Sequence, residues 1–62
     1  MTLSDQLMQK ILDDDYDSVK NLILGGADVN FPDKEGISPL MKSVLAGNRK
    51  TLLLLLSEGA NP

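Results

Sequence analysis

An internal repeat constrains this chain more than any other feature of its sequence. The pair Gly26-Ala27 recurs 33 residues later as Gly59-Ala60, and Leu7-Met8 recurs at the same offset as Leu40-Met41. Further matched pairs are Leu12 and Leu45, Leu22 and Leu55, Ile11 and Val44, Val19 and Leu52, and Ile23 and Leu56. Self-similarity at this period is typical of proteins that stack copies of one small unit.

Each copy has the apolar spacing of two short helices. The first-helix stripes are Leu7, Met8, Ile11 and Leu12 in one copy and Leu40, Met41, Val44 and Leu45 in the other. The second-helix stripes are Val19, Leu22 and Ile23, and then Leu52, Leu55 and Leu56. Apolar residues at this spacing share one helix face. We expect Leu52, Leu55 and Leu56, which match Val19, Leu22 and Ile23, to belong to the core.

Polar residues that can cap a helix stand before each of the first three stripes. Ser4 is the expected cap of the first helix and places Asp5 in its first turn, near the positive end of the helix dipole. Asp15 or Asp17 is expected to cap the second helix. Ser38-Pro39 is expected to begin the third, because proline is well tolerated at the first helical position.

Glycines mark where the helices end. Gly25-Gly26 is expected to end the second helix and Gly47-Asn48 the third, before a fourth helix from about Lys50 to Ser57. Between the two copies, the segment from Asp33 to Gly36 has the residues of a β-turn, with Asp first and Gly last.

The loop sequences resemble those of the ankyrin repeat family. Asp33-Lys34-Glu35-Gly36-Ile37-Ser38-Pro39-Leu40 is similar to the turn and first-helix start of an ankyrin repeat, and Gly26-Ala27-Asp28-Val29-Asn30 to the segment between repeats. The resemblance implies an all-α fold of two stacked ankyrin-type helix-turn-helix repeats with a β-turn loop between them. It implies one domain over residues 1–62, with a cap-like first repeat at 1–30 and a second repeat at 31–62 whose C-terminal face is uncapped.

Two departures from the family pattern carry expectations of their own. The family usually has histidine where this chain has Met41, and we expect Met41 to replace the histidine's hydrogen bonds to the turn with apolar packing. The first copy has Gln6 in place of the proline and Leu3 in place of the preceding glycine, which suits a terminal cap.

The composition excludes most chemistry. The chain has no histidine and no cysteine, which removes the usual zinc ligands and the commonest acid–base catalyst. The acidic segment Asp13–Asp17 fails as a calcium loop, because Ser18 and Leu24 stand where that loop needs Gly and Glu. We therefore predict that the protein is not an enzyme and has no catalytic residues, cofactor or metal site.

Charge and hydropathy limit the classes of partner. A net charge of −3 argues against nucleic acid, which requires clustered Lys and Arg. The longest apolar run, Leu52–Leu56, is far shorter than the roughly 20 residues that span a bilayer. Residues 1–12 have no signal-peptide pattern, and the lack of cysteine fits an intracellular, cytoplasmic protein.

The leucine run contains two residues beyond those that the core requires. Leu53 and Leu54 match Lys20 and Asn21 of the first copy, so we expect them to point out of the core. The resemblance to ankyrin repeats implies that Leu54 faces a following repeat. Burying two leucines is worth at most about 3–6 kcal/mol. We expect another copy of the chain, a different protein or further repeats to cover this face. Tolerated exposure is the alternative.

The resemblance to ankyrin repeats implies a second candidate surface, which consists of the turn tips and the exposed side of the first helices. Its residues are Lys34, Glu35, Ile37, Leu45 and Ala46, which place an apolar centre inside a charged rim. For Leu45 the alternative is packing in the core with Leu12. These five residues and Leu53 and Leu54 are the predicted protein-binding residues.

These observations predict a non-catalytic protein–protein interaction module that presents turn tips and first-helix faces to a protein partner. Two alternatives stay open. One is a homo-oligomer in which a second copy of the chain binds through the Leu53/Leu54 face. The other is a small acidic inhibitor or decoy that uses Asp13–Asp17 to occupy a basic site.

Overall fold

The structure is a computed structural model that describes residues 2–61. Within this range it consists of four helices and no strand. The helices are α1 (Leu3–Leu12), α2 (Tyr16–Leu24), α3 (Pro39–Ala46) and α4 (Arg49–Ser57). The all-α prediction is confirmed. Met1 and Pro62, the two ends of the predicted domain, lie outside the described residues.

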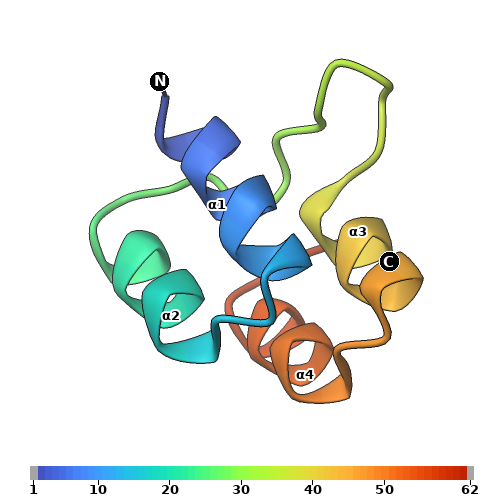
Figure 1. The fold of residues 1–62 in the computed structure, drawn as a ribbon. Helices are drawn as coiled ribbons and strands as arrows, with labels where there is room; N and C mark the ends of the chain where they lie inside the picture. The colour runs from blue at the N-terminus through green and yellow to red at the C-terminus, as the bar shows by residue number, and fades with distance from the viewer. Residues whose placement is uncertain (1, 62) are drawn as a thin grey trace.

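The helices form two pairs that lie side by side (Figure 1). In the first pair α1 packs against α2, and in the second pair α3 packs against α4. The pairs meet through α1 against α3 and through α2 against α4. The 33-residue offset relates α1 to α3 and α2 to α4, so the second pair repeats the first. The loop before α3 extends away from the helices (Figure 1).

Three of the helices begin at side chains that accept a backbone hydrogen bond. Thr2 caps α1 by accepting from the Asp5 amide at 3.1 Å. The prediction of Ser4 is wrong, because Thr2 is the residue with extended backbone and Ser4 already lies inside the helix. Asp15 caps α2 through the Ser18 amide, and Ser38 caps α3, as predicted.

The start of α4 lacks such a cap. Asn48 occupies the N-cap position that Asp15 occupies in the first pair, but its Nδ2 donates to the Ile11 carbonyl oxygen at 2.6 Å. The Thr51 hydroxyl is buried without a hydrogen-bond partner, whereas the matching hydroxyl of Ser18 donates to Asp15 at 2.8 Å. Asn48 therefore makes a hydrogen bond between the two helix pairs and does not cap α4.

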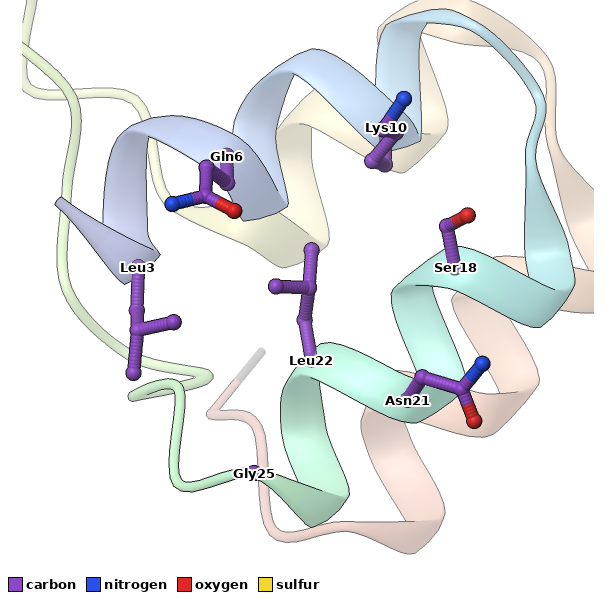
Figure 2. A pocket seen from close by; sticks show the side chains of 7 residues that line it. All are labelled: Leu3, Gln6, Lys10, Ser18, Asn21, Leu22 and Gly25. Atoms are coloured by element: carbon purple, nitrogen blue, oxygen red, sulfur yellow. The ribbon is translucent and has the colours of Figure 1, made fainter. Parts of the chain in front are cut away.

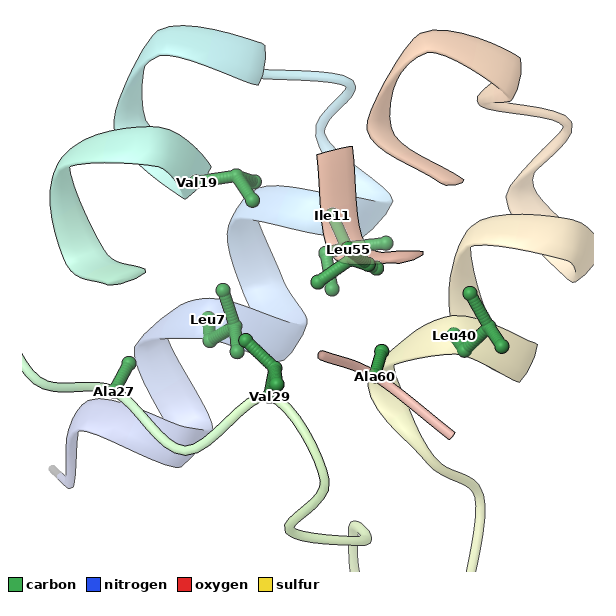
Figure 3. Close-up of a cluster of buried hydrophobic side chains, with 8 residues drawn as sticks. All are labelled: Leu7, Ile11, Val19, Ala27, Val29, Leu40, Leu55 and Ala60. Carbon is green, nitrogen blue, oxygen red and sulfur yellow. The ribbon is translucent and has the colours of Figure 1, made fainter. Parts of the chain in front are cut away.

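The hydrophobic core lies between the helix pairs and against the loops that end them (Figure 3). Most of its members come from the repeated positions, including the two alanines that follow Gly26 and Gly59. The cluster consists of Leu7, Ile11, Val19, Ala27, Val29, Leu40, Leu55 and Ala60. Leu22, Ile23, Leu52 and Leu54 are partly buried against it.

Several residues of the predicted stripes are exposed instead of buried. These are Leu12, Met41, Val44, Leu45 and Leu56. The stripes identify an apolar face correctly, but α3 and α4 have the first pair on one side only, so part of their apolar surface lies uncovered by residues 2–61. Ser43, which the stripe omits, is fully buried instead and donates to the Leu40 carbonyl oxygen at 2.6 Å.

The leucines of α4 differ from the prediction in which of them are buried and which are exposed. Leu55 is fully buried and Leu53 is 59% exposed, as expected. Leu54 is half-buried and packs against the core, so its predicted outward direction is corrected. Leu56 is exposed, and its predicted core position is wrong.

We expect Leu55→Ala and Leu53→Ala to differ sharply, although they lie two residues apart in one helix. Removing the Leu55 side chain leaves a cavity in the core and should lower the free energy of unfolding by about 2–5 kcal/mol. Leu53→Ala should change it by about 0.5 kcal/mol or less. Urea unfolding followed by circular dichroism measures both, and equal losses would contradict this core assignment.

We also expect Asn48→Ala to destabilise the protein by about 1 kcal/mol, because the Ile11 carbonyl loses a hydrogen bond from the other helix pair. Asn48→Asp supplies a helix cap but no donor, so it should not restore the wild-type stability. Gln9→Ala, which removes an exposed bond to Asp13, is the control. An Asn48→Asp protein as stable as the wild type would show that a cap on α4 contributes more stability than the hydrogen bond to Ile11.

Candidate functional site

The loop before α3 contains the predicted β-turn, which backbone and side-chain hydrogen bonds hold in place. The Gly36 amide donates to the Asp33 carbonyl oxygen at 2.9 Å, and Gly36 has a positive φ of 80° that glycine adopts without strain. The Asp33 carboxylate accepts from the amides of Glu35 and Ile37, each at 2.9 Å. The turn therefore presents its tip, Lys34 and Glu35, on a well-ordered frame.

An ion pair fastens this turn to α3. Lys42 Nζ lies 2.8 Å from Asp33 Oδ2, and both side chains are largely covered. The predicted role of Met41 is corrected, because Met41 is half-exposed and the next residue makes the connection instead. No local pattern in the sequence links Asp33 to Lys42. The pair becomes visible only when the loop folds back on the helix.

The same contacts set the protonation of Asp33. The hydrogen bond from Lys42 and the backbone hydrogen bond from Ile37 both favour the charged carboxylate and lower the pKa of Asp33. Asp33 therefore remains charged over the whole physiological pH range and keeps the turn attached to α3.

The turn faces α1 across a groove of about 230 Å³. The groove is lined by Asp5, Met8, Gln9, Leu12, Asp33, Lys34 and Glu35. The four α1 residues are spaced three and four apart, so they share one helix face. Nothing in the sequence places this face opposite the turn. Asp5, Met8, Gln9 and Leu12 were not among the predicted site residues.

The predicted protein-binding residues do not form one continuous site. Lys34 and Glu35 are exposed and line the groove. Leu45 is 66% exposed and Leu12 is also exposed, so the alternative that both pack in the core is wrong. Ile37 and Ala46 are half-buried, and neither lines the groove.

The other two predicted residues, Leu53 and Leu54, lie on α4. This helix belongs to the second-helix layer, whereas the groove is built from α1 and the turn. Leu54 is half-buried against the core, so the two leucines do not make one exposed face.

The acidic segment between α1 and α2 has local structural roles. Asp15 caps α2, and its hydrogen bonds to the Ser18 hydroxyl and amide lower the pKa of Asp15. Asp13 accepts from the Gln9 side chain, and Asp14 takes a left-handed backbone with φ of 57°. Among residues 2–61, no group of three or more His, Cys, Asp or Glu is placed to hold a metal ion. No described helix has the length and apolar character needed to cross a membrane.

The sequence is similar to part of a known human protein. Over 57 residues, which are 90% of this chain, the sequence is 39% identical to the human 2-5A-dependent ribonuclease. The matched region is 8% of that protein, so the chain spans a small part of its relative. That relative contains ankyrin repeats. No family model matches the sequence.

We expect the protein to lose stability in acid, in part through Asp33. A carboxyl whose pKa is lowered by folding contributes stability above its unfolded pKa of about 3.9, and this contribution is lost as the pH falls through the folded pKa. Asp33→Asn keeps the turn geometry but not the ion pair. Its thermal midpoint should therefore fall less than that of the wild type between pH 5 and pH 2. Parallel curves for the two proteins would contradict the assigned role of Asp33.

Proposed function

We propose that this chain is a member of the ankyrin repeat family and a non-catalytic protein–protein interaction module. The observation that carries the proposal is the groove between the rigid turn and α1. Its partner surface is the turn tip, Lys34 and Glu35, together with the exposed face of α1. We place the protein inside the cell, in the cytoplasm, where proteins rarely contain disulfides, and this fits its lack of cysteine.

The composition of the groove supports protein binding. Leu12 is an exposed apolar side chain, and Asp5, Gln9, Lys34 and Glu35 surround it with polar groups. Apolar anchors inside a polar rim are typical of protein interfaces. The hydrogen bonds of Asp33 order the turn before any partner binds, which reduces the entropy lost on association.

The titratable groups favour a non-catalytic role. The fold lowers the pKa of Asp15 and of Asp33, whereas a carboxyl that acts as general acid or base at neutral pH needs a pKa raised toward 7. Both carboxylates are engaged in helix capping or in the turn. The likeness to a ribonuclease covers too little of that protein to carry its activity to this chain.

Affinity capture with matched surface variants tests this proposal. The immobilised protein is exposed to cell extract, and retained proteins are quantified by mass spectrometry for the wild type and for Leu12→Glu and Lys34→Glu. We expect both changes to reduce specifically retained proteins at least about tenfold, as loss of an interface anchor does.

Leu24→Glu is the control, because Leu24 is 73% exposed at the end of α2 and does not line the groove. It makes the same chemical change elsewhere and should leave the retained set unaltered. Circular dichroism confirms that all variants fold. Equal retention by all four proteins would contradict the groove as the binding surface.

A further inference from the structure

The outer face of the first helix pair differs from the matching surface of the second pair. At the 33-residue offset, Lys10 matches Ser43 and Asn21 matches Leu54. Ser43 is fully buried, and Leu54 is half-buried against the core. Lys10 is half-buried and Asn21 is exposed. The first pair therefore has longer or polar side chains where the second pair has short or apolar ones that the fold covers.

Lys10 makes this outer face unsuitable for packing against a further helix pair. Such packing would place the Lys10 side chain where that of Ser43 is 0% exposed. A lysine is almost never fully buried unless its charge is paired, and among residues 2–61 Lys10 forms no ion pair. The ammonium group of Lys10 is therefore available to a ligand of opposite charge.

A hollow of about 300 Å³ lies on this face, between α1 and α2. Its lining is divided into a polar end and an apolar end (Figure 2). Lys10, Ser18 and Asn21 lie at the polar end. Leu3 lies at the other end, and the Leu22 side chain points into the space between them. Small-molecule sites are typically concave and mostly apolar, with a few polar groups that fix the orientation of the ligand.

The polar end favours a ligand with a single negative charge. The Asp15 carboxylate accepts there from the Ser18 amide at 3.2 Å and from the Ser18 hydroxyl at 2.8 Å. These hydrogen bonds, and to a smaller extent the charge of Lys10, lower the pKa of Asp15, which is therefore ionised at neutral pH. A dianion such as phosphate would meet one cation beside this carboxylate, and the repulsion would double relative to a monoanion.

We propose that this hollow binds a small amphipathic carboxylate, a short apolar chain that ends in one carboxylate group. The carboxylate pairs with the Lys10 ammonium and accepts an N–H from the Asn21 carboxamide. The apolar chain lies against Leu22 and extends toward Leu3. The hollow shares no residue with the groove of the proposed function, so the two proposals fail independently.

The test is an NMR titration of the isotope-labelled full chain with octanoate. We expect saturable shifts of the backbone amides around the hollow, with a dissociation constant of about 1–10 mM, as is ordinary for so small a ligand. Octanamide, which has the same apolar chain and a neutral head, should bind about fivefold more weakly, because hydrogen bonds to a charged group are stronger. Acetate, which has the head without the chain, should produce no saturable shifts.

Two lysine variants provide the matched comparison. Lys10→Met keeps an apolar stem and removes the charge, so octanoate should bind it about as weakly as octanamide does. Lys20→Met makes the same change at an exposed position of α2 that does not line the hollow, and it should bind octanoate like the wild type. Circular dichroism confirms that both variants fold.

Three results would overturn the proposal. One is octanoate binding that does not saturate, or whose shifts centre on the exposed apolar residues of α3 and α4. Another is equal affinity for octanoate and octanamide, which would remove the role of the charge. The last is an equal loss of octanoate affinity in Lys10→Met and Lys20→Met, which would show an effect of net charge and not of this site.

Discussion

The whole structure depends on the mutual burial of two helix pairs, neither of which is large enough to bury its own apolar surface. Leu7, Ile11 and Leu55 are fully inaccessible to water in the core that the two helix pairs share. A chain of 62 residues without disulfides has little stability beyond such burial. The hydrogen bond from Asn48 to Ile11 lies at this contact and fixes how one pair sits on the other.

That hydrogen bond explains why two equivalent segments differ. In the first pair the residue before α2 is Asp15, which caps the helix and satisfies the hydroxyl of Ser18. In the second pair the equivalent Asn48 turns toward its neighbour, and Thr51 is left buried without a partner. A cap is worth about 1 kcal/mol, and an unsatisfied buried hydroxyl costs about as much or more. Both of these free-energy costs accompany the hydrogen bond that Asn48 makes between the two helix pairs.

Much of the candidate site was predictable, because turn chemistry is local. Asp33 and Gly36 stand three residues apart, and their positions in a β-turn follow from the preferences of Asp and Gly. The wall that α1 contributes was not found, since nothing local brings Asp5, Gln9 and Leu12 opposite a loop more than twenty residues away. The same holds for the ion pair between Lys42 and Asp33, because the prediction was that Met41 would contact the turn through apolar packing.

The sequence by itself determined the four helices, most of their ends and the repetition of one unit. These features depend on capping residues, glycines and apolar spacing within about ten neighbouring residues. Only the tertiary structure decided which apolar residues are buried. Met8 and Met41 occupy equivalent helix positions, but Met8 is buried and Met41 is half-exposed. Burial is a property of layers in contact, and a helical stripe specifies a face without specifying its cover.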